Sequence, residues 1–210
     1  MSGSRRPSPP LPECGQEPGL GYERTRRLLD LAGGCVGLLL LGVLFVPIAL
    51  AILLEDGPPV VFAQTRVGKG ERLFRIFKLR TIAHDGRITR VGRWLRRSAL
   101  DELPQFWNVL RGEMSLVGPR PELPELYAAY QPWQRRRVEV LPGLTGWWQV
   151  NGRRQPMIDH VRYDIEYLER RSLLWDLYIL LLTGPSLLQG PESPPPQAAP
   201  AAERRHLAAG

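Results

Sequence analysis

The stretch Leu31–Leu54, LAGGCVGLLLLGVLFVPIALAILL, decides how the rest of the chain can be arranged. It holds no charged residue, and as a helix with a rise of 1.5 Å per residue it would be about 36 Å long, enough to cross a bilayer. Pro47 lies inside this run, where it removes a backbone hydrogen bond and kinks or breaks the helix. The sequence therefore predicts a membrane segment with a break at Pro47.

Basic residues flank this segment on both sides, Arg27 and its neighbours before it and Arg66 and its successors after it. Because basic flanks favour the cytoplasmic side of a membrane, two such flanks predict that both ends stay in the cytoplasm and that the segment enters and returns. Membrane helices also tolerate proline, so the residues alone leave an ordinary spanning helix equally open.

A second apolar stretch, Leu173–Leu188, is too short to span a bilayer and contains Asp176. Gly184 and Pro185 interrupt it. Its aromatic residues suit a segment at the level of the lipid headgroups, but a buried core helix explains the same pattern. Both interpretations stay open at this point.

The composition of the 210-residue chain limits its class. Its 28 basic and 21 acidic residues give a net charge of +7. The positive charge is nearly all arginine, whose planar guanidinium group binds phosphate with two hydrogen bonds more readily than lysine does. Cys14 and Cys35 are too few for a disulfide framework or a metal cluster, which favours a reducing compartment. Prolines concentrate in residues 1–22 and 190–210, so both ends are predicted to be disordered.

The segments after the membrane stretch predict a β-hairpin. Val60–Val67 and Leu73–Arg80 are rich in apolar and β-branched residues, and Gly68-Lys69-Gly70 between them is typical of a turn. Alternation along the second strand places Lys78 and Arg80 on one face.

An amphipathic helix is predicted next, with Val91, Trp94 and Leu95 on its apolar side and a run of arginines that includes Arg96. This pattern suits a helix that lies at an interface or faces an anion, but ordinary surface charge explains it too.

The stretch Leu100–Gly112 predicts a helix with two carboxylates, Asp101 and Glu102, at its start. Apolar residues recur at helical spacing, Pro104 is tolerated in the first turn, and Gly112 suits the end. The free N–H groups and the helix dipole favour an anion there, so Asp101 is expected to stay ionised at neutral pH, as a nucleophile or magnesium ligand must be. A simple N-cap role explains Asp101 as well.

Arg120 lies between Pro119 and Pro121, which fix the backbone on both sides. Such a loop presents a guanidinium at low entropic cost, as phosphate recognition requires, although a rigid turn with an exposed arginine is the plain alternative. Farther on, Pro142–Arg153 contains two turn signals around an aromatic pair, and Ile158–Leu168 predicts an amphipathic packing helix.

In this order the motifs resemble the bacterial sugar transferase family, the monotopic phosphoglycosyl transferases that start glycan assembly on a polyprenol phosphate. The resemblance covers about residues 24 to 188. It rests on KLRT from Lys78, ITRVG from Ile88, LDELPQ from Leu100, NVLRG from Asn108, MSLVGPRP from Met114, PGLTG from Pro142, QVNGR from Gln149 and LWDL from Leu174.

The resemblance implies an α/β fold: a small, mostly helical catalytic domain with a short β-hairpin, an N-terminal re-entrant helix-break-helix membrane segment and interfacial amphipathic helices. The expected order is a Pro-rich tail at 1–22, the re-entrant helix at 23–56, a cytoplasmic transferase domain at 57–189 and a Pro/Ala-rich tail at 190–210. The catalytic domain would lie on the cytoplasmic face of the bacterial inner membrane.

The resemblance also implies transfer of a sugar 1-phosphate from a UDP-sugar to polyprenol (undecaprenyl) phosphate, with release of UMP, through an aspartyl-phosphosugar intermediate. By motif match, Asp101 is the expected nucleophile and Glu102 its dyad partner, with Mg²⁺ at the pair. The expected partners are the two substrates and inner-membrane lipid, and the sequence allows an oligomer. The expected substrate contacts are Lys78, Arg80, Arg96, Arg120, Arg153 and Asp176.

The chain departs from the family pattern at a few positions, none of which touches the dyad. Val46 stands where a serine often precedes the membrane proline, and Leu79, Ile82 and Leu141 replace the usual residues of their motifs. Two other functions are weighed. A catalytically silent membrane scaffold is disfavoured by the intact acidic pair, and a membrane-tethered nucleic-acid binder is disfavoured because no nucleic-acid module appears.

Overall fold

The computed structural model describes residues 19–152 and 157–187, and the fold is mostly helical, as expected. The tails predicted for the two ends fall largely outside these residues. The elements are α1 Leu20–Asp56, β1 Val61–Val67, η1 Lys69–Glu71, β2 Leu73–Leu79, α2 Arg90–Ser98, η2 Leu100–Gln105, α3 Phe106–Arg111, β3 Ser115–Val117, α4 Pro124–Ala128, α5 Pro132–Arg135, η3 Arg136–Glu139, β4 Gly143–Thr145, α6 Trp147–Gly152, α7 Met157–Arg170 and α8 Leu173–Leu187.

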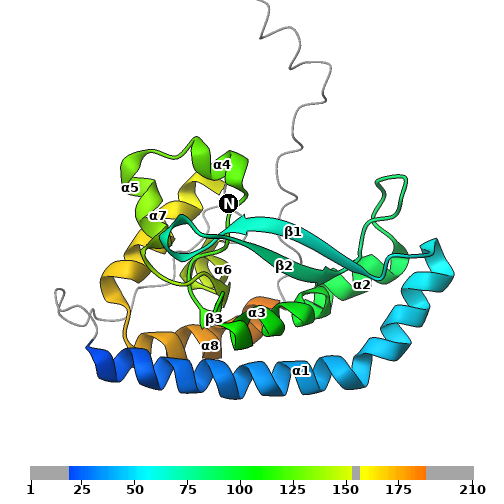
Figure 1. The fold of residues 1–210 in the computed structure, drawn as a ribbon, viewed down its shortest axis with the longest axis horizontal. Helices are drawn as coiled ribbons and strands as arrows, with labels where there is room; N and C mark the ends of the chain where they lie inside the picture. Colours follow the sequence, from blue (N-terminus) through cyan, green and yellow to red (C-terminus); the bar gives the residue numbers. More distant parts are fainter. Residues whose placement is uncertain (1–18, 153–156, 188–210) are drawn as a thin grey trace, which may run out of the picture.

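Helix α1 runs along one side of the molecule, and the remaining elements lie above it in Figure 1. It begins at Leu20, three residues before the predicted start, and ends at Asp56. The expected break at Pro47 is absent, since Pro47 lies inside one continuous helix. The C-terminal part of α1 nevertheless bends away from the line of the N-terminal part (Figure 1), as a proline in a helix interior favours.

Glycines let α1 approach the catalytic domain closely. A methyl group at Gly34 would lie 2.5 Å from Leu110, and one at Gly37 would lie 2.2 Å from the ring of Phe106. Both neighbours belong to α3, so the apolar residues predicted for that helix pack against α1. The seam has no room for a side chain on the α1 side.

Polar bonds fix the N-terminal end of α1 to the domain. Arg27 donates to the carbonyl oxygens of Val109 and Leu110 at 2.7 and 2.6 Å, which satisfies free carbonyls at the end of α3. Asp30, which is buried, accepts from the hydroxyl of Ser115 at 2.9 Å and from the backbone N–H of Leu116 at 2.8 Å.

A second set of bonds fixes the C-terminal end of α1. The carboxylate of Glu55 accepts from the backbone N–H groups of Arg90 and Val91 at 2.6 and 2.9 Å, and so caps the start of α2. Asp56 accepts from Arg80 at the end of β2, with 2.8 Å between Oδ2 and Nη1. Both ends of α1 are therefore bonded to the same domain.

The predicted hairpin is confirmed. Strands β1 and β2 pair antiparallel, with Phe62 opposite Lys78 and Arg66 opposite Phe74, so these four side chains share one face. Gly70 in the turn has φ of 61°, which glycine adopts without strain. A second pair of short strands, β3 and β4, is parallel and was not predicted from the sequence.

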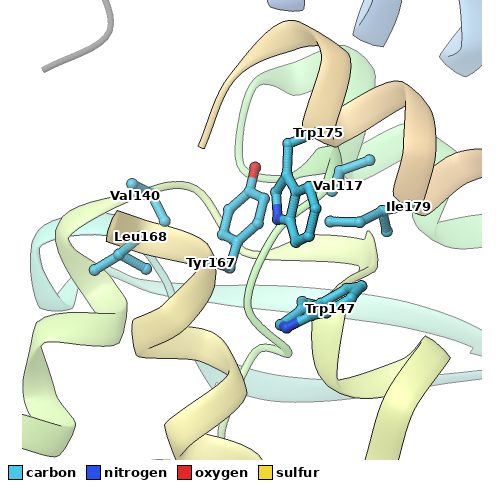
Figure 2. Packing of buried hydrophobic residues seen from close by; sticks show 7 residues of the cluster. All are labelled: Val117, Val140, Trp147, Tyr167, Leu168, Trp175 and Ile179. Carbon is cyan, nitrogen blue, oxygen red and sulfur yellow. The ribbon is translucent and has the colours of Figure 1, made fainter. Parts of the chain in front are cut away.

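The main core lies between α6, α7, α8 and the short parallel strands. Figure 2 shows the packing of Trp147, Tyr167, Trp175 and Ile179 within it, and the ring centroids of the two tryptophans are 4.6 Å apart. The core interpretation of this aromatic group is thus confirmed. The further members of the cluster in Figure 2 are Val117, Val140 and Leu168.

Helix α8 is buried on one side, as the core interpretation predicts, and its position at a membrane stays a prediction. Its Trp175 and Ile179 are buried, whereas Leu174, Leu177 and Leu181 are exposed. The predicted interruption near its end is wrong, because α8 continues through Pro185 to Leu187. Exposed apolar side chains also occur along α1, among them Leu39, Val43 and Leu54.

The seam between α1 and α3 predicts opposite effects for two glycine substitutions. Gly37→Ala should lower the free energy of unfolding by about 1–3 kcal/mol, because the added methyl group overlaps the Phe106 ring. Gly42→Ala, in the same helix but with nothing within 4 Å, should raise it by about 0.5–1 kcal/mol. Thermal unfolding in detergent micelles measures the stability of both variants. Equal effects of the two substitutions would contradict the close packing of α1 against α3.

Candidate active site

The acidic pair lies in a tight turn between two helices. Ala99 ends α2 in the left-handed conformation, with φ of 54°, and the chain turns directly into η2. This sharp turn places Asp101 beneath α2, where its side chain is buried and the residue is only 8% exposed. The predicted α-helix thus begins with a 3₁₀ turn, and the predicted C-terminal glycine, Gly112, is confirmed with φ of 75°.

Two cations accompany the carboxylates. Lys78 Nζ on β2 lies 2.6 Å from Glu102 Oε1, and both side chains are about four-fifths buried. Arg96 on α2 donates from Nε to the hydroxyl oxygen of Thr81 at 2.9 Å, and its charge acts on Asp101. The structure therefore brings four of the predicted site residues together.

Burial raises the pKa of Asp101 to about 6, and the neighbouring charge of Glu102 adds to this rise. The charges of Lys78 and Arg96 oppose it. The predicted stabilisation of the anion by helix N–H groups is therefore outweighed by burial, and the ionised state at neutral pH stays a prediction.

Arg120 lies in a separate part of the structure, on the loop after β3. Its guanidinium carbon is 5.1 Å from the centre of the Trp148 ring, a cation–π distance. Arg66 lies between this loop and the acidic pair. It donates to the carbonyl oxygen of Pro121 at 3.1 Å, and the charges of Arg120 and Glu102 both act on it. Burial and the charge of Arg120 lower the pKa of Arg66 to about 10.

Arg66 was missed by the sequence analysis, although the hairpin register could have indicated it. Alternate residues of β1 face the same side as Lys78, and Arg66 is one of them. Arg137 was also missed, and no pattern in the sequence could have indicated it. It lies in a run of three arginines typical of a solvated surface, yet its side chain is only 4% exposed, whereas Arg135 and Arg136 are exposed.

Arg80 and Asp176 do not join the acidic pair. Arg80 is bonded to Asp56 and to the end of α1. Asp176 is buried and accepts from the hydroxyl groups of Tyr22 at 2.8 Å and Tyr167 at 2.7 Å. Their partners give both residues a structural role. Arg153 lies outside the described residues.

The arrangement suits an anionic reactant. A buried carboxylate with a second carboxylate beside it and two cations around it can serve as a nucleophile or as a ligand of a hard cation. Within residues 19–152 and 157–187 there is no group of three or more His, Cys, Asp or Glu side chains placed to hold a metal ion. A divalent ion bound by Asp101 and Glu102 would complete its coordination with water or with oxygen atoms of a bound substrate.

Comparison with known proteins identifies the relationship. The sequence pattern of the bacterial sugar transferase family matches residues 21–190, which include every element described above. The chain belongs to the bacterial sugar transferase family. The resemblance predicted from the motifs is thereby confirmed.

Relatives of this bacterial sugar transferase include three informative proteins. The UDP-glucose:undecaprenyl-phosphate glucose-1-phosphate transferase of Caulobacter vibrioides is 41% identical over 87% of this chain and 74% of its own length. The undecaprenyl-phosphate glucose phosphotransferase of Komagataeibacter xylinus is 41% identical over 75% of this chain and 35% of its own. Galactosyl transferase CpsE of Streptococcus agalactiae is 36% identical over 79% of this chain and 42% of its own length. The chain thus spans less than half the length of the last two.

The buried ties of Asp176 predict a loss of stability when its charge is removed. Asp176→Asn should lower the free energy of unfolding by about 3 kcal/mol, because Arg26, 4.0 Å away, would keep a buried charge with a weaker counter-charge. Thermal unfolding measures this effect.

The matched control is Asp85→Asn, which removes an exposed carboxylate paired with exposed Arg87 and should leave the melting temperature nearly unchanged. An Asp176→Asn protein as stable as the wild type would contradict the structural role.

Proposed function

We propose that this bacterial sugar transferase moves a sugar 1-phosphate from a UDP-sugar to polyprenol phosphate and releases UMP. One observation supports this above the others: a buried Asp101 lies beside Glu102, with Lys78 and Arg96 around the pair. The names of the relatives, which act on undecaprenyl phosphate, agree with it. Relatives named for glucose and for galactosyl transfer leave the sugar open.

The reaction proceeds in two displacements at one phosphorus atom. A carboxylate oxygen of Asp101 attacks the phosphorus that bears the sugar, and the bond to the UMP oxygen breaks, so UMP leaves as a phosphate anion. An oxygen of polyprenol phosphate then attacks the same phosphorus and displaces the carboxylate of Asp101. The split is useful because one substrate arrives from water and the other from the bilayer, so both can use one site in turn.

The cations lower the repulsion between this nucleophile and its anionic substrates. Lys78 holds Glu102 and leaves Asp101 free to attack, while Arg96, fixed by Thr81, faces the pair with a rigid charge. Arg120 and Arg66 extend the positive region toward the second phosphate of the donor. Arg153 remains a proposed contact from its motif alone.

Mg²⁺ fits this site as a cofactor. Burial first, and the charge of Glu102 second, raise the pKa of Asp101, and a divalent cation bound at the pair would oppose both effects. Two carboxylates with substrate phosphates are the usual surroundings of Mg²⁺. When bound by Asp101 and Glu102, the ion would neutralise developing charge on the transferred phosphoryl group.

The proposed membrane arrangement is monotopic. Helix α1 is long and apolar enough to cross a bilayer, but both of its ends are bonded to one domain. Because a folded domain lies on one side of a membrane, both ends of α1 belong to that side. The bent helix then dips into the lipid with its exposed apolar side and places the dyad near the headgroups, on the cytoplasmic face of the inner membrane.

Replacing the nucleophile should abolish the reaction. Asp101→Asn keeps the size of the side chain but is a far poorer nucleophile, so we expect transfer of labelled sugar phosphate to undecaprenyl phosphate to fall at least about 10³-fold. The wild-type protein, mixed with the UDP-sugar it uses but no lipid acceptor, should release up to one UMP per active site and gain the mass of a sugar phosphate.

Two controls make this test specific. Glu169→Gln removes an exposed carboxylate on α7, outside the site, and should keep full activity. An Asp101→Asn protein that is folded and fully active would contradict the assignment of the nucleophile, and product formation without any covalent adduct would contradict the two-step route.

Cysteine labelling tests the topology. Cys14 and Cys35 are first replaced by serine, and a single cysteine is then introduced at Thr25 or at Val60, one near each end of α1. A membrane-impermeant maleimide added to intact cells should label neither position, and both should react after the membrane is opened. Labelling of only one position in intact cells would contradict the monotopic arrangement.

A further inference from the structure

The loop that carries Arg120 is held unusually firmly. The backbone N–H of Gly118 donates to the carbonyl oxygen of Thr145 at 2.9 Å, and the carbonyl oxygen of Pro119 accepts from Gly143 at 2.8 Å. The carbonyl oxygen of Arg120 itself accepts from Arg137 Nη2 at 2.7 Å. The backbone of Arg120 is therefore bonded directly to a second arginine.

Arg137 is the centre of a buried polar cluster. Its Nη2 lies 2.6 Å from Asp164 Oδ2, and its Nη1 lies 3.2 Å from Glu122 Oε2 and 2.9 Å from the hydroxyl oxygen of Tyr130. Glu122, like Arg120, belongs to the loop after β3, whereas Asp164 belongs to α7. Arg137 thus fixes the loop to α7 through two different loop residues.

The side chain of Arg120 lies over Trp148, which is buried, with its guanidinium carbon 5.1 Å from the centre of that ring. The charges of Arg137 and Arg120 both act on the carboxylate of Asp164. Arg120 is therefore held at its backbone by Arg137 and at its side chain by Trp148.

We propose that Arg137 is a positioning residue, which holds the backbone of Arg120 so that the Arg120 guanidinium binds a phosphate of the nucleotide sugar. This inference rests on the proposed function. In this role Arg137, which is buried, acts through the backbone of Arg120, and its second loop contact, Glu122, lies 3.9 Å from Arg66.

A lysine cannot replace Arg137 in this role. The guanidinium fork contacts two carboxylates, a hydroxyl and a carbonyl oxygen from two separate nitrogens, whereas the single nitrogen of lysine cannot reach all four. Arg137→Lys therefore preserves the buried charge but loosens the hold on Arg120. This makes it a milder change than removal of the charge, which would leave buried carboxylates unpaired.

A double-mutant cycle tests the proposal on the full-length protein in detergent, with UDP-glucose as the probe donor and undecaprenyl phosphate as acceptor. Arg120→Ala should lower kcat/KM for the donor about 30-fold, the range of a charge-assisted phosphate contact. Arg137→Lys should lower it about 5- to 10-fold in the wild-type background and less than about 2-fold when Arg120 is already alanine. Calorimetry measures the affinity of the same four proteins for UDP-glucose, which gives the cycle a second readout.

Controls separate positioning from folding. Arg136→Lys, at the exposed neighbouring arginine, should leave both readouts unchanged. If Arg137→Lys does not fold, Tyr130→Phe removes one hydroxyl that holds Arg137 and should show the same coupling at about 2-fold size.

The outcomes are distinguishable. Loss of the Arg137→Lys effect in the Arg120→Ala background supports the proposal. Multiplicative effects in an active enzyme contradict this inference and leave the proposed function intact. A wild-type protein that neither transfers sugar phosphate from any UDP-sugar of a panel nor binds one contradicts the proposed function and this inference together.

Discussion

The bonding of both ends of α1 to one domain is the constraint on which the rest of the structure depends. Arg27 and Asp30 fix the first part of the helix to α3 and β3, and Glu55 and Asp56 fix its end to α2 and β2. The elements at the far end carry Arg96 and Lys78, the cations of the candidate site. The apolar helix and the acidic pair are therefore parts of one rigid arrangement rather than an anchor and a separate enzyme domain.

The site itself balances burial against charge. Burial disfavours an ionised Asp101, and the second carboxylate makes ionisation harder, whereas the charges of Lys78 and Arg96 favour the ionised form. Fixed partners hold each cation: Glu102 holds Lys78, and Thr81 holds Arg96. A phosphate group that enters this region meets charges that need no rearrangement, which is the arrangement that electrostatic catalysis requires.

Features set by short-range pattern were predictable from the sequence. The hairpin, the helix of α7 and the stop at Gly112 follow from alternation, helical spacing and glycine chemistry, and the catalytic role of the motif around Asp101 stays a prediction. The roles of Arg80 and Asp176 were not predictable, because their partners, Asp56 and Tyr22, lie 24 and 154 residues away in the chain. Arg137 was hidden for a similar reason, since only the tertiary fold separates it from its exposed neighbours.

The glycine seam has a consequence for the proposed lipid acceptor. Gly34 and Gly37 meet Leu110 and Phe106 of α3 so closely that a methyl group would overlap them, and Gly33 meets Leu116 of β3 in the same way. These positions leave no space for an isoprenoid chain, so under the proposed function the tail of the acceptor would lie along the exposed apolar side of α1.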